Sequence, residues 1–241
     1  MKALILAAGR GTRLGQLTEN KNKCLIKIGG KPLITYSLDC VVKTPVSEIV
    51  IVVGHMAEEI IKTLGDNYKG KPIKYVFQPE QKGLVHAIDC AKDALDKNDF
   101  MLMLGDELMK NPRHLEMIKK FREESHTAIC GMVRVESPDL IKKTFTIIQG
   151  ENNQIFRLIE KPTHPFGNLM GTGNCIFKNE ILSYIPKTPI SWQRKEKELV
   201  DLIQCAIDDG KLVKSFIICD RYFNINSPEE IKEIKSYFAH L

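Results

Sequence analysis

The sequence has no apolar run that approaches the roughly 18 residues of a membrane-spanning helix. Its first apolar run stops at Gly9 and Arg10, which is too soon for a secretory signal peptide. Lysines and arginines are scattered, and no dense basic stretch carries the interleaved aromatic residues of a nucleic-acid-binding surface. We therefore expect a cytoplasmic protein with neither a membrane nor a nucleic acid as its partner.

Cysteines are present, but they show no pairing pattern. The seven cysteines are odd in number, and no two have the Cys-x-x-Cys spacing of a zinc or redox site. Most of them lie within apolar runs. This pattern is typical of reduced core cysteines in the cytoplasm, and it disfavours a disulfide framework or a zinc centre.

The remaining composition is that of an ordinary globular enzyme. The chain has 241 residues, of which 43% are apolar and 27% are charged, enough for the core of one large α/β domain. The net charge of +5 is modest and suits an anionic substrate.

Strand and helix patterns alternate in the first part of the chain. We expect strands at 3–6, 49–53, 73–77 and 100–104, and helices at 32–43, 57–64 and 84–95. This alternation predicts βαβ units and a largely parallel sheet.

The second part of the chain is richer in short strands. We expect helices at 112–121, 195–209 and 228–239, and strands at 127–135, 144–148, 155–159, 174–177 and 213–218, with a turn at 150–153. We predict a single domain over 1–241 whose two parts share one sheet and meet near residue 110.

The stretch after the first strand is a glycine-rich turn, Ala7-Ala8-Gly9-Arg10-Gly11-Thr12-Arg13-Leu14. Small residues and glycines let backbone N–H groups approach a ligand closely. Arg13 and, further on, Lys23 add fixed positive charge. The pattern therefore predicts a polyphosphate ligand.

Two common phosphate-binding loops do not fit this turn. A dinucleotide-binding fingerprint would need a third glycine where Leu14 stands, and an acid after the second strand, where Gly54 and His55 follow instead. No Walker A string occurs anywhere in the chain. An NAD-dependent enzyme is therefore disfavoured.

The motifs, taken together, resemble the signature of sugar-phosphate nucleotidyltransferases. The resemblance begins with segments 6–14, 23–25 and 30–34 and continues in order through 78–87, 104–107, 160–162 and 220–230, so that it covers nearly the whole chain. It implies a Rossmann-like α/β fold, with a mostly parallel central sheet, helices on both faces and a smaller β-rich part. It also implies a nucleotide-binding half of about 1–110 and an acceptor-binding half of about 111–241.

The resemblance further implies an activity and a cofactor. The family transfers a nucleotidyl group from an NTP, here expected to be UTP or dTTP, to a sugar 1-phosphate, with Mg²⁺ as cofactor. The substrates are thus the expected partners, and relatives are often homo-oligomers. Base, acceptor and oligomeric state are open at this level.

The site residues carry over by matching position. The catalytic pair is Arg13, on the leaving pyrophosphate, and Lys23, on the α-phosphate, with Lys21 as the competing lysine. The expected nucleotide-binding residues are Leu6, Ala7, Ala8, Gly9, Gly11, Thr12, Gln78 and Gly83. The expected acceptor-binding residues are Glu160, Lys161, Thr172 and Gly173. The expected metal ligands are Asp106 and Asn224, with Asn226 and Asp220 as alternatives to Asn224.

Physical reasons support several of these assignments. A glutamine amide offers both a donor and an acceptor, which match N3–H and O4 of uracil or thymine, so Gln78 is expected to read the base. Asp106 follows an apolar strand and should lie at the carboxyl edge of the sheet, where open α/β folds bind ligands. His86 is expected to be a helix residue without a catalytic role.

The chain departs from the family pattern at a few positions. Asn22 and Cys24 replace the prolines beside the lysine, Asn224 replaces an aspartate, and Thr144-Phe145 replaces a Tyr-Gly pair of the acceptor pocket. The altered pocket leaves open a second acceptor class, alcohol phosphates such as phosphocholine or an inositol phosphate, with CTP as a candidate nucleotide. Asn224 leaves open a non-catalytic regulatory relative.

Overall fold

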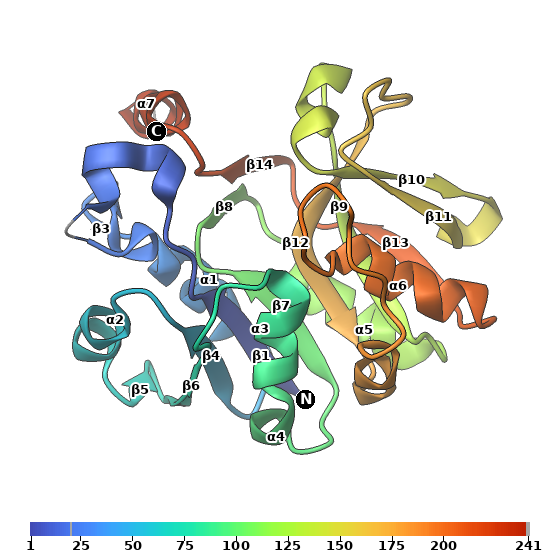
Figure 1. The fold of residues 1–241 in the computed structure, drawn as a ribbon, viewed down its shortest axis with the longest axis horizontal. Helices are drawn as coiled ribbons and strands as arrows, with labels where there is room; N and C mark the ends of the chain where they lie inside the picture. The colour runs from blue at the N-terminus through green and yellow to red at the C-terminus, as the bar shows by residue number, and fades with distance from the viewer. Residues whose placement is uncertain (20, 240–241) are drawn as a thin grey trace.

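One sheet of eight strands runs through the centre of the computed structural model, which describes residues 1–19 and 21–239 (Figure 1). The strands follow the order β13-β9-β12-β7-β1-β4-β6-β5. Their bounds are Lys2–Ala7 (β1), Ile49–Val53 (β4), Asn67–Tyr68 (β5), Lys71–Phe77 (β6), Phe100–Leu104 (β7), Ala128–Arg134 (β9), Leu169–Phe177 (β12) and Val213–Ile217 (β13).

Most of this sheet is parallel, as the alternation of strands and helices predicts. Strand β1 pairs in parallel with β4 and β7, β4 pairs in parallel with β6, and β9 pairs in parallel with β13. Strand β12 is antiparallel to both of its neighbours, β7 and β9. It therefore joins strands of the first part of the chain to strands of the second part within one sheet.

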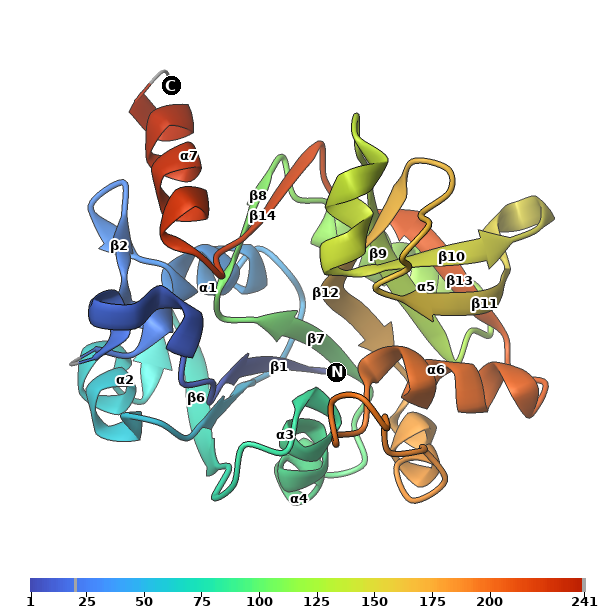
Figure 2. The ribbon, with the colours of Figure 1, turned by 45° about the horizontal axis from the view of Figure 1, so that its top comes forward.

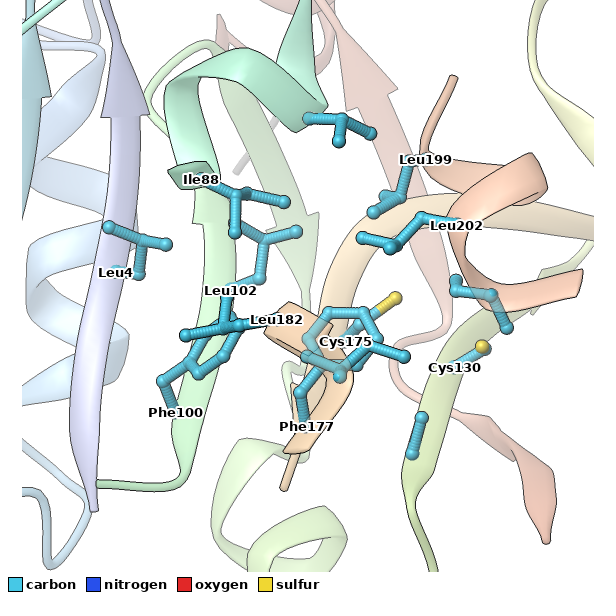
Figure 3. Close-up of a cluster of buried hydrophobic side chains, with 14 of the residues drawn as sticks. Leu4, Ile88, Phe100, Leu102, Cys130, Cys175, Phe177, Leu182, Leu199 and Leu202 are labelled. Atoms are coloured by element: carbon cyan, nitrogen blue, oxygen red, sulfur yellow. The ribbon is translucent and has the colours of Figure 1, made fainter. Parts of the chain in front are cut away.

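Helices cover both faces of the sheet. Successive side chains of a strand point to opposite faces, so Leu4 belongs to one buried cluster and Ile5 to the other. The first cluster packs under Ile88 and Leu202, from α3 and α6, and Figure 3 shows it in close-up. The helices are Ile34–Val41 (α1), Ala57–Leu64 (α2), Leu84–Cys90 (α3), Lys92–Leu95 (α4), His114–Glu123 (α5), Leu199–Asp208 (α6) and Pro228–Ala239 (α7).

Some predicted boundaries were wrong, and the causes are local. The first helix begins at Ile34 instead of residue 32, because Pro32 pairs with Lys27 in a short hairpin, Lys27–Ile28 (β2) and Lys31–Pro32 (β3). The predicted helix 84–95 is divided at Ala91, and the helix predicted from 195 begins only at Leu199, after a positive φ of 59° at Lys195. Strand β12 begins five residues earlier than the predicted 174.

Short strands outside the main sheet complete the fold. Strands Phe145–Gln149 (β10) and Ile155–Glu160 (β11) form the predicted hairpin around residues 150–153. Strands Glu107–Lys110 (β8) and Arg221–Asn224 (β14) pair antiparallel, which the sequence did not predict. Helix α7 packs on Leu14, Ile28 and Leu33 of the N-terminal region through Ile231 and Ile234 (Figure 2).

Among the helices that the structure describes, none combines the length and the apolar character that a membrane crossing requires.

Candidate active site

A cleft of about 410 Å³ lies at the carboxyl edge of β1 and β7, with walls from both parts of the chain. Every residue that the motifs nominated for catalysis, nucleotide binding, acceptor binding or metal binding lines this cleft. Lys21 and Asp220, the alternatives for the phosphate-binding lysine and for a metal ligand, are not among the lining residues. Asp220 instead forms an ion pair with Arg113.

The glycine-rich loop that is expected to bind phosphate follows β1 and closes against the side chain of Lys23. Gly11 has φ of +66°, and a Cβ there would lie 3.1 Å from Lys23 Cβ, so a side chain would be strained and crowded. The Gly11 carbonyl accepts from the Leu14 N–H at 2.9 Å and from Thr18 Oγ1 at 3.0 Å, and the 3₁₀ segment Thr12–Thr18 (η1) follows. Arg13 is exposed at the cleft and forms no ion pair with any residue that the structure describes.

Hydrogen bonds at Asn22 hold Lys23 in place without the family's prolines. Asn22 is fully buried; its Oδ1 accepts from the Cys24 N–H at 2.8 Å and its Nδ2 donates to the His55 carbonyl at 2.7 Å. Lys23 itself is 7% exposed, and its Nζ forms an ion pair with Asp106 and donates to Asn226 Oδ1 at 3.0 Å.

The pairing of β8 with β14 completes the acidic side of the cleft. Asn224 lies opposite Glu107 in this pair, directly beside Asp106. Asn226 Nδ2 donates to Asn224 Oδ1 at 3.0 Å, and the Asn226 N–H donates to Glu230 Oε2 at 2.6 Å. Glu230 also accepts from the Ser227 N–H while Ser227 Oγ accepts from the Glu230 N–H, which is the capping box expected at the start of α7.

These side chains offer a set of oxygen donors that suits a hard cation. Asp106 supplies one carboxylate, and Asn224 and Asn226 supply amide oxygens within the same cleft. Within residues 1–19 and 21–239, no group of three or more His, Cys, Asp or Glu side chains could hold a metal by itself. Mg²⁺ takes few carboxylates and completes its shell with substrate phosphates and water, so this donor set fits it.

The opposite wall carries the residues expected to read the base. Gln78 follows β6 and is 3% exposed; its Nε2 donates to the Gly83 carbonyl at 3.2 Å and lies 3.0 Å from His86 Nδ1. Gly83 has φ of +88°, and a Cβ there would lie 2.6 Å from Glu196 Oε2. Only glycine therefore fits under the segment that carries Glu196.

The residues expected to bind the acceptor lie at the end of β11 and in the middle of β12. Lys161 has φ of +40°, an uncommon value for a residue with a side chain, and its N–H donates to the Thr144 carbonyl at 2.6 Å. Its Nζ lies 3.4 Å from Glu160 Oε1. Thr172 Oγ1 donates to the Gly131 carbonyl at 2.9 Å, so Thr172 supports the strand through its side chain.

Sequence reasoning missed Arg194, which lines the cleft beside the acceptor residues. Its guanidinium lies 3.7 Å from Glu160, 2.9 Å from Glu196 and 3.2 Å from Glu198. The only local signal for this site was an arginine followed by alternating lysines and glutamates, residues 194–198, just before a helix. Burial raises the pKa of Glu160 and of Glu198, and the nearby cations oppose the rise.

Glu107 supports the floor of the cleft from below. It is 1% exposed and accepts hydrogen bonds from the Gly173 N–H at 2.9 Å, from Asn174 Nδ2 at 2.6 Å and from the Tyr222 hydroxyl. Burial raises the pKa of Glu107 to about 8, and these hydrogen bonds oppose the rise only in part.

The raised pKa of Glu107 predicts a pH dependence of stability. A carboxyl group with a higher pKa in the folded protein stabilises it at low pH, and this contribution is lost as the pH rises toward the folded value. From this group the free energy of unfolding should fall between about pH 4.5 and 8, by at most about 1.4 kcal/mol per pH unit. Glu107→Gln has no carboxyl group to titrate, so this pH-dependent part of the free energy of unfolding is absent from the variant. The free energy of unfolding of the wild type should therefore fall relative to that of the variant as the pH rises. Denaturant unfolding across this range measures it; a pH-independent difference would contradict the assignment.

Comparisons with known proteins agree with the motifs and with the fold. The family model described as Nucleotidyl transferase matches residues 2–224. The chain is 36% identical to the UTP–glucose-1-phosphate uridylyltransferase of Haloferax volcanii, over 97% of this chain and 94% of that protein. It is 30% identical to a glucose-1-phosphate thymidylyltransferase of Streptomyces griseus, over 97% of this chain and 65% of that protein.

Solved structures share the fold at lower sequence identity. A UDP-glucose pyrophosphorylase complexed with UDP-glucose has a TM-score of 0.88 at 21% identity and covers 99% of this chain, with 98% of its own chain matched. The UTP-bound enzyme of Acinetobacter baumannii has a TM-score of 0.81 at 21% identity, over 98% and 92% of the two chains. The predicted fold class and family are thus confirmed, and the chain belongs to the nucleotidyl transferase family.

Proposed function

We propose that the protein transfers a nucleotidyl group from UTP or dTTP to a sugar 1-phosphate and releases pyrophosphate. The observation that carries this proposal is the single cleft that contains a phosphate-binding loop, the Lys23–Asp106 pair and the Glu160–Lys161 pair. The names of the two curated relatives, a uridylyltransferase and a thymidylyltransferase of glucose 1-phosphate, support the same reaction.

The reaction is an in-line displacement that requires positioning and charge neutralisation. An oxygen of the acceptor phosphate attacks the α-phosphorus, and pyrophosphate leaves from the opposite side. No general base is needed, because a phosphate monoester is already ionised near neutral pH. In this proposal Arg13 binds the leaving pyrophosphate, Lys23 binds the α-phosphate and Lys161 binds the acceptor phosphate, each through charge.

Asp106, Asn224 and Asn226 would hold Mg²⁺ together with the phosphates of the NTP. When bound, the ion supplies positive charge that neutralises the triphosphate. In the structure the Lys23 ammonium already pairs with Asp106. Before any substrate binds, its positive charge therefore offsets the single negative charge of the residues that would hold the ion.

We also propose that the protein works in the cytoplasm. All seven cysteines are free and four of them are buried, which suits a reducing compartment. The division into a nucleotide-binding and an acceptor-binding half and the formation of a homo-oligomer stay predictions.

A second acceptor class is favoured by Phe145. Its ring packs so closely on Gly171 that a Cβ there would overlap it, and both residues line the cleft on the acceptor side. The ring is only 5% exposed, so it fills space beside Gly171 that the glycine of the family pattern would leave empty. The alternative is therefore a nucleotidyltransferase for the phosphate of a non-sugar alcohol.

A pyrophosphate-release assay with Mg²⁺ separates these possibilities. The common NTPs are each combined with a panel of sugar phosphates and alcohol phosphates. We expect turnover with UTP or dTTP and a sugar 1-phosphate. Turnover only with an alcohol phosphate would favour the second candidate, and binding of nucleotide without any turnover would favour a regulatory relative.

Removing either phosphate-binding cation should impair catalysis more than folding. We expect Arg13→Ala and Lys23→Ala each to lower kcat about 100-fold, since each removes one positive charge that would neutralise the reacting phosphates. Lys21→Ala, two residues from Lys23 but outside the cleft, is the matched control and should keep its activity. Steady-state kinetics and thermal melting measure this; an Arg13→Ala enzyme with normal melting and full activity would exclude the role.

The pairing of Lys23 with Asp106 should weaken metal binding in the absence of nucleotide. Lys23→Met removes the competing ammonium, so we expect its affinity for Mn²⁺, measured by electron paramagnetic resonance without NTP, to rise about tenfold. Lys21→Met leaves the pair intact and should not change the affinity. A Lys23→Met protein that binds Mn²⁺ no better than wild type would show that Lys23 does not compete with the metal.

A further inference from the structure

Glu107 is a buried carboxyl group that the proposed reaction does not use. It is 1% exposed, and all of its described partners are neutral groups: the Gly173 N–H at 2.9 Å, Asn174 Nδ2 at 2.6 Å and the Tyr222 hydroxyl. A buried acid whose partners are all neutral costs stability relative to an apolar side chain of similar shape. Residues of this kind are expected where function outweighs stability.

The partners of Glu107 come from two different strands. Gly173 and Asn174 lie in β12, a strand of the central sheet, and Tyr222 lies in β14. Strand β14 pairs with β8 outside the eight-stranded sheet, so in the described part of the chain no ladder of backbone hydrogen bonds joins it to β12 (Figure 2). The Glu107 carboxyl group therefore provides a direct hydrogen-bonded link between the two strands.

Both strands carry residues that the motifs assign to the cleft. Gly173 is expected to bind the acceptor, and Asn224, two residues after Tyr222, is expected to bind the metal. Residues two apart in a strand share a face, so the side chains of Tyr222 and Asn224 lie on one side of β14. Glu107 itself directly follows Asp106, the other expected metal ligand.

The Tyr222 hydroxyl connects Glu107 to Asn224. Burial and the Glu107 carboxyl group raise the pKa of this hydroxyl, and a hydrogen bond from the Asn224 side chain opposes the rise. Asn226 Nδ2 in turn donates to Asn224 Oδ1 at 3.0 Å, and Asn226 Oδ1 accepts from Lys23 Nζ at 3.0 Å. A continuous chain of hydrogen bonds thus runs from β12 through Glu107 and Tyr222 to the two asparagines and Lys23.

We propose that Glu107 is a positioning residue that fixes Asn224, through Tyr222, relative to the strand that carries acceptor residues. The inference rests on the proposed function, since it concerns the metal and the acceptor of the same cleft. Mg²⁺ demands near-ideal octahedral geometry, so its affinity depends on how precisely each ligand is placed. An in-line displacement also requires the nucleotide and the acceptor to be held at a fixed separation.

The test measures the affinity for Mn²⁺ by electron paramagnetic resonance without NTP. Tyr222→Phe removes the bridging hydroxyl and keeps the ring, so we expect the Mn²⁺ affinity to fall about tenfold, as is usual when a residue that supports a metal ligand is changed. Tyr184→Phe is the matched control. The Tyr184 hydroxyl donates to Asp209 Oδ2 at 2.6 Å, and Tyr184 is not among the residues that line the cleft, so its loss should leave the affinity unchanged.

Substitutions of Glu107 test the same link from its other end. Glu107→Gln keeps one oxygen that can accept from both Gly173 and Tyr222, whereas Glu107→Leu keeps neither bond. We therefore expect Glu107→Leu to lower the Mn²⁺ affinity about tenfold and Glu107→Gln to retain most of it. A residue that only stabilised the fold would change the melting temperature without this difference in affinity.

Kinetics provide a second measurement on the same variants. In the pyrophosphate-release assay at saturating Mg²⁺, Tyr222→Phe should lower kcat about tenfold and change the KM for UTP by less than about twofold, because misplacement of the reacting groups affects the chemical step more than nucleotide binding. Tyr184→Phe should keep the kcat of the wild type.

If Glu107→Leu does not fold, Tyr222→Phe alone tests the inference. A folded Tyr222→Phe that binds Mn²⁺ as tightly as the wild type, or a wild type that binds no Mn²⁺ without NTP, would overturn it. Such an enzyme could still release pyrophosphate from UTP and a sugar phosphate. A wild type without turnover would instead overturn the proposed function, and the Mn²⁺ titrations would still test the role of Glu107.

Discussion

The ion pair between Lys23 and Asp106 is the contact on which the arrangement of the cleft depends. Strands β1 and β7 are neighbours and run in parallel, so both end at the same edge of the sheet. The loop after β1 leads to Lys23, and Asp106 follows β7. Lys23 is almost fully buried, so its ammonium needs the carboxylate of Asp106, and the pair joins the loop after β1 to the loop after β7.

Close backbone approach shapes the other side of the cleft. At Gly171 a side chain would overlap the ring of Phe145, and at Gly173 it would overlap Leu104 and Glu107. The register of β12 against β9 shifts between Gly171 and Cys175, which includes Gly173, while the strand stays antiparallel to β7. The close approach at Gly173 lets its N–H donate to Glu107, so β12 is joined directly to the residue that follows Asp106.

Side-chain amides make many of the remaining contacts around the cleft. Asn22 uses both ends of its amide to replace the rigidity that prolines would supply. Asn226 joins Lys23, Asn224 and Glu230, and Lys143 forms an ion pair with Glu230 from the acceptor side at 2.7 Å. Helix α7 is therefore tied to both walls of the cleft.

Much of the fold could be predicted because its signals are local. The β-branched run 49–53 is strand β4, the turn at 150–153 joins β10 to β11, and Ser227 with Glu230 caps α7. The gathering of the motifs was predictable as well, since strands that run in parallel bring the residues that follow them to one edge. Helix ends were less accurate where pairing or a positive φ intervened, as at Pro32 and Lys195.

The sequence by itself determined the α/β class, the family motifs and the residues that these motifs nominated for the cleft, because these depend on spacing along the chain. Only the tertiary structure decided the pairing of β8 with β14, the place of Arg194 among its glutamates and the direction of the Gln78 amide. The pairing of β8 with β14 joins residues that lie far apart in the sequence, and Arg194 lies in an irregular segment whose path no local pattern predicts. The third depends on which partner faces each end of one side chain, and no local pattern of residues specifies that.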